Sequence, residues 1–157
     1  IEDASHQSQF FLLPMSSRRL DAVHRHLAAA PRSSSTAVAM SYKSPVTSHV
    51  LDTSRGCPAA NMHIELQHFV NGQWTTVNGG RTNSDGRVSG ALVPENAAFQ
   101  PGTYRMVFHT QQYFEASGVT EFFYPEVSIA FLVKDVTQHY HVPLLINPFG
   151  YSTYRGS

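Results

Sequence analysis

Short stretches of alternating apolar and polar residues, separated by turn residues, dominate the chain from residue 45 onward. The alternation is clear over residues 62–69, 103–109 and 127–133, and further strands are expected over 46–51 and 139–146. Asn71-Gly72, between Val70 and Trp74, predicts a tight hairpin turn. Because no strand–helix–strand rhythm is present, the pattern predicts an all-β sandwich rather than a parallel α/β sheet.

Two local features interrupt this pattern. Residues 111–117 lack alternation and predict one short helix, which Gly118 would end. Pro143 lies inside the last predicted strand and has no backbone N–H to donate to a neighbour. We therefore expect that strand at a sheet edge or at a bulge.

The first 44 residues differ from the rest. They are rich in Ser, Ala and Arg, carry few large apolar residues after Leu27, and resemble a linker over 31–35. We expect a flexible amino-terminal arm over 1–44, with a helix over 17–30, and one folded domain over 45–157.

A spaced motif within this arm resembles the type-2 peroxisomal targeting signal, Arg-Leu, five residues, His-Leu. Its four positions are Arg19, Leu20, His26 and Leu27. Such a signal is an address that an import receptor reads. The motif therefore indicates a peroxisomal location, although a short amphipathic helix or a mitochondrial presequence has a similar composition.

Charge and cysteine content limit the classes of partner. Lys plus Arg equals Asp plus Glu at 11 each, so we expect no attraction to nucleic acid or to a membrane surface. No apolar run approaches the ~20 residues that span a bilayer. Cys57 is the single cysteine, which excludes an intramolecular disulfide and favours a small, partly buried thiol. Nine histidines point to acid–base or metal chemistry.

Four segments carry candidate functional residues. His49 lies within an apolar strand and points away from the core if Val50 points into it; the alternative is a surface histidine. Arg87 follows the turn Asp85-Gly86, where it is either a solvated arginine or a guanidinium that binds a planar ligand through paired hydrogen bonds.

The other two segments lie near the carboxyl end. His139 and His141 share one face of a strand, as two metal ligands or as a base beside a structural histidine. Residues 151–157 hold two tyrosines and an arginine, which is unusual for a fraying end, although an ordinary last edge strand is the alternative. No Cys-x-x-Cys pair, His-Glu-x-x-His motif or Gly-rich phosphate loop is present.

Together the segments 47–52 with 56–60, 82–87, 139–145 and 154–157 resemble the 5-hydroxyisourate hydrolase family, also called transthyretin-like proteins. The resemblance covers residues 45–157, about seven-tenths of the chain. It implies a transthyretin-type eight-stranded β-sandwich with one short helix. It also implies a homotetramer whose central channel holds active sites between paired dimers, with no metal and no cofactor.

The resemblance further implies hydrolysis of 5-hydroxyisourate to 2-oxo-4-hydroxy-4-carboxy-5-ureidoimidazoline, a step of urate degradation. Its implied catalytic residues are His49, Arg87, His141 and Ser157, and its implied substrate-binding residues are His49, Arg87, Tyr154 and Ser157. The two histidines would transfer protons, with the base undecided between them, while Arg87 would stabilise negative charge and Ser157 would orient substrate or water. Some members carry the same peroxisomal signal, which supports the motif in the arm.

Three other functions remain open from the sequence. A transthyretin-like carrier of a small aromatic ligand would need an apolar channel rather than histidines and an arginine. A zinc hydrolase would use His49, His139 and His141. An inactive structural homologue would keep the fold without the activity.

Overall fold

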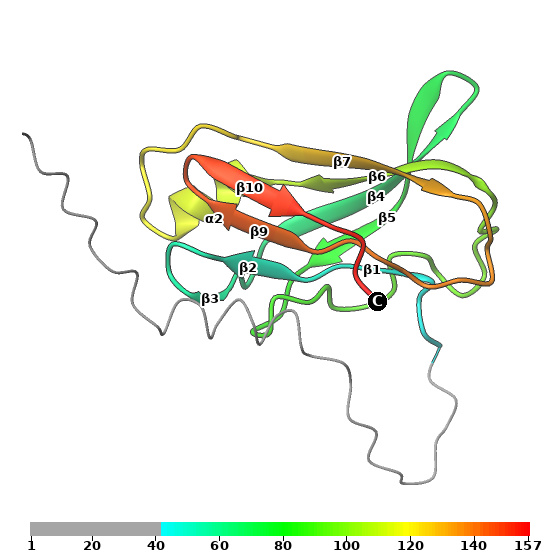
Figure 1. Cartoon of the computed structure of the whole chain (residues 1–157), viewed down its shortest axis with the longest axis horizontal. Helices are drawn as coiled ribbons and strands as arrows, with labels where there is room; N and C mark the ends of the chain where they lie inside the picture. The colour runs from blue at the N-terminus through cyan, green and yellow to red at the C-terminus, as the bar shows by residue number, and fades with distance from the viewer. Residues whose placement is uncertain (1–41) are drawn as a thin grey trace, which may run out of the picture.

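A computed structural model describes residues 42–157, so the arm, its helix and its targeting motif lie outside the described residues. Ten strands and one helix follow in chain order: β1 Val46–Thr47, β2 Val50–Asp52, β3 Cys57–Pro58, β4 His63–Val70, β5 Gln73–Arg81, β6 Gly102–Phe108, α2 Thr110–Ala116, β7 Val127–Val133, β8 Tyr140–His141, β9 Leu144–Asn147 and β10 Gly150–Thr153 (Figure 1). No helix within 42–157 is long and apolar enough to cross a membrane.

The first sheet is built around a parallel pairing of two distant segments. β1 pairs with β8, with Val46 opposite Tyr140, and β2 pairs with β9, with Val50 opposite Leu144. The register is the same in both pairings, so β1–β2 and β8–β9 each act as one interrupted strand. Counted in this way, the described chain has eight strands, and the predicted all-β architecture with one short helix is confirmed.

The second sheet is antiparallel, in the order β5-β4-β6-β7. The hairpin between β4 and β5 turns at Asn71 and Gly72, whose φ angles are 51° and 80°. Positive φ at both positions gives a turn whose twist matches that of the flanking strands. The predicted Asn-Gly hairpin is therefore confirmed.

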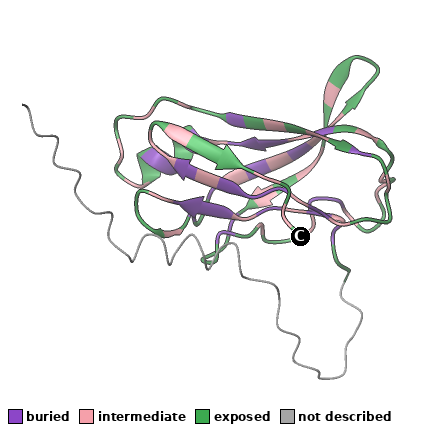
Figure 2. Cartoon of the chain, in the orientation of Figure 1, coloured by how far each residue is buried: buried purple, intermediate pink, exposed green. Residues whose placement is uncertain are grey.

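The core lies between the two sheets and follows the alternation of the strands. Buried residues come from both layers, and Figure 2 marks them in purple along the strands. Val50 and Leu144 face inward from the first sheet, and Ile64, Met106 and Phe108 face inward from the second. Each large apolar side chain that is fully buried contributes about 1.5–3 kcal/mol through its removal from water.

Pro143 lies in the interruption between β8 and β9, and the strand that follows it is not the edge strand that was one of the two expectations. β9 lies between β10 and β2, inside the sheet. The N–H groups of Val142 and Leu144 donate to the carbonyls of Thr47 and His49, so the nitrogen of Pro143 faces the opposite neighbour. The regular pairing of β9 with β10 ends at the pair Leu144 and Thr153. Pro143, which has no N–H to donate, lies one residue beyond this pair, so no hydrogen bond between β9 and β10 is lost.

Helix α2 begins one residue earlier than predicted and joins β6 to β7. Gly118, with φ of 75°, ends it as expected, and its N–H donates to the carbonyl of Glu115. Tyr113 on this helix donates a hydrogen bond of 2.9 Å to the buried carboxylate of Asp52. This contact fixes the helix against the end of the first sheet.

Candidate active site

The candidate site occupies the outer face of the first sheet. Val46, Ser48 and Val50 are buried, so the alternate residues Thr47 and His49 point to the other side, where they are half-buried. His49 thus points away from the core, as its place in the strand predicted. Its backbone carbonyl accepts a hydrogen bond of 2.9 Å from Leu144, which fixes its height in the sheet.

Backbone pairing brings the four sequence segments to this face. Arg87 lies opposite His49 in an antiparallel bridge, His141 lies opposite Thr47, and Gly156 lies opposite His141. Residues that oppose each other across a ladder direct their side chains to the same face. The ladder therefore places Arg87, His49 and His141 on one surface.

The turn before Arg87 depends on Gly86. Its φ is 74°, and a Cβ at this position would collide with the carbonyl oxygen of Val50 and come within 3.1 Å of the His49 ring. The side-chain oxygen of Asn83 accepts hydrogen bonds of 3.0 Å from the backbone N–H groups of Asp85 and Arg87. These contacts set the position from which the exposed Arg87 side chain extends.

Thr47 connects His141 of β8 with His139, which directly precedes that strand. Its hydroxyl lies 2.9 Å from Nε2 of His139 and 2.9 Å from Nδ1 of His141. One hydroxyl has one hydrogen to donate, so at most one of the two imidazole nitrogens accepts from it and at least one donates to its oxygen. The tautomers of the two rings are therefore coupled through Thr47.

The charge state of His139 favours one direction for this chain of hydrogen bonds. Burial lowers the pKa of His139, and the positive charge of Lys43 lowers it further. A neutral His139 can accept the Thr47 hydrogen, which leaves the Thr47 oxygen to accept an N–H from His141. In this arrangement His141 can carry a proton on Nδ1.

The carboxyl-terminal segment lies against His141. The N–H of Gly156 donates to the carbonyl of His141 at 3.0 Å, and a Cβ on Gly156 would collide with the His141 ring. Tyr154 and His141 line a cavity of about 280 Å³ whose other walls include Ile129 and Phe131. Burial raises the pKa of the Tyr154 hydroxyl. The segment is thus a packed part of the site.

The fold pairs some of the predicted site residues directly and places others only nearby. Arg87 and His49 are paired directly, and His141 lies across the neighbouring strand. Ser157 is exposed and follows Gly156 at the end of the same segment. Sequence reasoning missed Thr47, although its position two residues before His49 already placed it on the same face.

The geometry does not favour the zinc hydrolase alternative. Within residues 42–157, three metal-binding side chains with ligand atoms within 4.8 Å of one another occur on the other sheet. His49, His139 and His141 do not form such a group, and the hydroxyl of Thr47 hydrogen-bonds both His139 and His141. The site instead offers imidazoles for proton transfer and a guanidinium for negative charge.

Comparison with known proteins places this arrangement in a family. The profile of the HIUase/Transthyretin family matches residues 46–156, which include the paired residues His49, Arg87, His141 and Gly156. The chain belongs to the HIUase/transthyretin family. The fold predicted from the sequence motifs is that of this family.

Several members of the HIUase/transthyretin family are similar to this chain over most of their length. A 5-hydroxyisourate hydrolase of Salmonella dublin is 47% identical over 109 residues, 69% of this chain and 78% of the relative. A 5-hydroxyisourate hydrolase of Mus musculus is 43% identical and covers 73% of this chain and 96% of its own.

Solved structures of the HIUase/transthyretin type share the fold. Klebsiella pneumoniae 5-hydroxyisourate hydrolase has a TM-score of 0.59 at 31% identity, covering 71% of this chain and 92% of its own. Sparus aurata transthyretin has a TM-score of 0.66 at 29% identity, covering 72% and 97%. A chain of (S)-allantoin synthase has a TM-score of 0.66 at 37% identity, and the match covers 71% of this chain and 43% of that one.

Proposed function

We propose that this protein hydrolyses 5-hydroxyisourate to 2-oxo-4-hydroxy-4-carboxy-5-ureidoimidazoline. The observation that carries the proposal is the backbone ladder that holds Arg87, His49 and His141 on one face. Relatives 47% and 43% identical bear the name of this hydrolase. A site with two imidazoles and a guanidinium matches the demands of opening a cyclic amide with water.

The reaction requires one water and no other reactant. One histidine of the His49 and His141 pair removes a proton as the water oxygen adds to the ring carbonyl carbon. Arg87 donates hydrogen bonds to the oxyanion that forms. When the carbon–nitrogen bond breaks, the proton moves to the departing nitrogen, which leaves a carboxylate and an opened ring.

The contacts of Thr47 suit His141 to hold a proton during this reaction. A protonated His141 donates from Nδ1 to the Thr47 oxygen, and the Thr47 hydrogen then points to Nε2 of a neutral His139. Ser157, at the end of the adjacent segment, would orient substrate or water, and Tyr154 would contact the substrate. Neither is assigned as a nucleophile.

An ultraviolet time course tests the proposal. Urate oxidase generates 5-hydroxyisourate from urate, and addition of the protein should remove its absorbance far faster than spontaneous decay. His49→Ala and Arg87→Ala should each lower the rate by about 10²–10⁴-fold, whereas His68→Ala on the other sheet should not.

The assay also discriminates the alternative function. Decay at the spontaneous rate, with a protein shown to be folded, would sink the hydrolase assignment. Binding of a small aromatic ligand in the cavity beside Tyr154 would then favour a carrier. The chain is 28% identical to the structure described as sea bream transthyretin in complex with thyroxine. An aromatic compound of the thyroxine type is therefore the ligand to test for a carrier.

The proposed functional unit is a homotetramer. Three large apolar side chains are exposed on β7 and β10 or directly before β10. They are Leu132, Phe149 and Tyr151, with exposed fractions of 53%, 68% and 43%. A second copy of the chain would cover them. Sedimentation of the whole chain should give four times the monomer mass, and a monomer would contradict the assignment.

We also propose a peroxisomal location. The proposal rests on Arg19, Leu20, His26 and Leu27 in the arm. A fluorescent protein fused after the chain should accumulate in peroxisomes, and Leu20→Arg should leave it dispersed. An unchanged distribution of the variant would contradict the role of the motif.

A further inference from the structure

Three metal-binding side chains meet on the outer face of the second sheet, away from the candidate active site. His63 and Glu65 are two residues apart on β4, where they alternate with the buried Ile64 and Leu66. His109 follows β6, the neighbouring strand, and its N–H donates to the carbonyl of His63 at 3.0 Å. One ligand atom from each of His63, Glu65 and His109 lies within 4.8 Å of the others.

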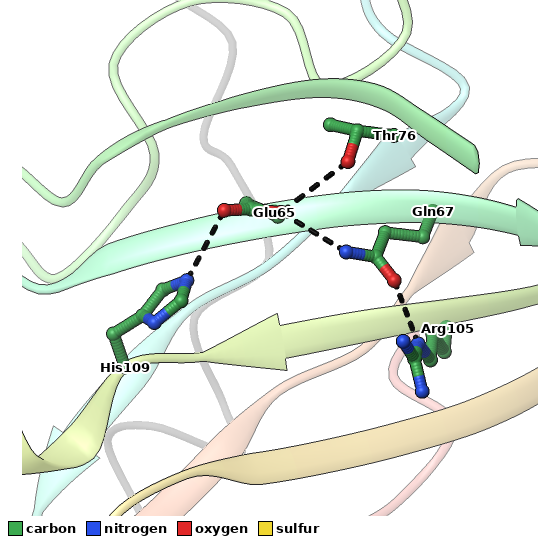
Figure 3. A network of polar contacts seen from close by, with 5 residues as sticks. All are labelled: Glu65, Gln67, Thr76, Arg105 and His109. Atoms are coloured by element: carbon green, nitrogen blue, oxygen red, sulfur yellow. Dashed lines mark hydrogen bonds and ion pairs between the residues drawn. The ribbon is translucent and has the colours of Figure 1, made fainter. Parts of the chain in front are cut away.

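The carboxylate of Glu65 is already oriented toward His109. Its Oε1 lies 3.2 Å from Nε2 of His109. Its Oε2 accepts hydrogen bonds from Gln67 at 3.0 Å and from Thr76 at 3.4 Å (Figure 3). Gln67 in turn accepts a hydrogen bond of 2.8 Å from Arg105. The second oxygen is thus held by neighbours, as outer contacts hold the ligands of metal sites.

The strand beside β4 leaves space over this group. Gly79 of β5 lies directly opposite Glu65. A Cβ on Gly79 would come within 3.3 Å of the Glu65 side chain and within 3.5 Å of Nε2 of His63. Arg81, opposite His63, directs its guanidinium to the carbonyl of Asn61 at 2.9 Å. Because position 79 is a glycine, no side chain from that position of β5 fills the space beside Glu65 and His63.

We propose that His63, Glu65 and His109 bind a divalent transition metal of the zinc class. Two imidazole nitrogens and one carboxylate oxygen form a known zinc ligand set, in which the fourth position goes to water. With zinc–ligand bonds of about 2.0–2.2 Å, ligand atoms around one tetrahedral ion lie roughly 3.3 Å apart. The His109–Glu65 pair already has this spacing. The ring of His63 is stacked on that of His109, with centroids 4.7 Å apart, so it must rotate to direct a nitrogen at the shared ion.

The proposed metal site is independent of the hydrolase. Its ligands lie on the outer face of the second sheet, whereas His49 and His141 lie on the outer face of the first, with the core between them. The site joins β4 to the end of β6. Bound metal should therefore stabilise the folded sandwich without entering the reaction.

The test uses the full chain freed of metal with a chelator and then titrated with Zn²⁺ alone. Wild type should bind one equivalent per chain and gain about 5–10 °C in Tm when free zinc exceeds its Kd a hundredfold. Co²⁺ in place of Zn²⁺ should give the visible absorption of tetrahedral cobalt. His109→Gln and Glu65→Gln should weaken binding by about a hundredfold or more while leaving hydrolase turnover unchanged.

Control variants assign the ion to this site. His68→Gln, on the same strand but outside the group, and His141→Gln, in the hydrolase site, should both bind zinc as wild type does. Absence of any zinc-dependent rise in Tm would overturn the proposal. Wild-type binding by a folded His109→Gln variant, or loss of binding by His141→Gln, would overturn it as well.

Discussion

The side-chain hydroxyl of Thr47 hydrogen-bonds Nδ1 of His141 at 2.9 Å, across the parallel pairing of β1 with β8. The same hydroxyl contacts Nε2 of His139 at the same distance. Because a hydroxyl has one hydrogen, the protonation of one imidazole restricts that of the other. Thr47 is thus a positioning residue for the proposed proton transfer.

Removal of this hydroxyl should slow hydrolysis without unfolding the protein. Thr47→Val keeps the shape of the side chain but loses a hydrogen bond worth about 0.5–1.5 kcal/mol, so kcat should fall by about 3- to 10-fold. The pH profile of kcat should also shift, which loss of packing alone would not cause. Thr47→Ser should retain both the rate and the profile. A valine variant with the wild-type profile would refute the coupling of the two rings.

Gly156 should be needed for the position of His141. Gly156→Ala places a Cβ against the His141 ring, whereas at Gly150, on the same segment, the nearest atom would be 3.5 Å away. Gly156→Ala should therefore lower kcat/KM by at least about tenfold, through displacement of the ring. Gly150→Ala should remain close to wild type in the same assay. Equal activity of the two variants would show that His141 tolerates displacement.

The turn at Gly86 should show a steric cost beyond that of its backbone angle. Gly86 and Gly72 have φ of 74° and 80°, and alanine at either costs about 1–2 kcal/mol for the left-handed conformation. A Cβ on Gly86 also meets Val50 and His49, while one on Gly72 meets nothing within 4 Å. Urea denaturation should therefore show a larger loss for Gly86→Ala, accompanied by lower hydrolase activity. Matching losses of stability would refute the steric contribution.

His139 should make stability depend on pH below neutrality. Its pKa in the folded protein lies below the ordinary 6.5, first through burial and then through the charge of Lys43. The unfolded chain therefore binds this proton first as the pH falls. The free energy of unfolding should decrease as pH drops from about 7 through 6.5 and below.

Two variants check this dependence by urea denaturation between pH 7.5 and 5. His139→Gln removes one titrating group and should reduce the pH dependence of the free energy of unfolding; His63, whose pKa burial also lowers, should supply part of the remainder. Lys43→Gln removes the repelling charge and should reduce the effect partially. A slope unchanged in His139→Gln would assign the dependence to other groups.

Much of the fold was predictable because side-chain alternation is a local property. The predicted range 127–133 coincides with β7, and β4 and β6 each begin within one residue of their predicted starts. β3 was not predicted, since two residues cannot display a period. The interior position of β9 was also missed, because the sequence does not tell which strands become neighbours.

For the candidate site, the sequence predicted which face each side chain points to but not which residues are in contact. Alternation alone indicated that His49 faces outward and that His139 and His141 share a face. The contact between Thr47 and His141 required knowledge of a parallel pairing between distant segments. The group His63, Glu65 and His109 was likewise hidden, because its third member comes from another strand.

The pairing of Thr47 with His141 joins residues 94 positions apart. A growing chain on the ribosome holds His49 and Arg87 long before it holds the strand that completes their surroundings. The segment that contains Gly156, which packs against His141, is made later still. Activity should therefore be absent until β9, β10 and the segment around Gly156 have been made, and it should be gained in one late step as these segments join the sheet.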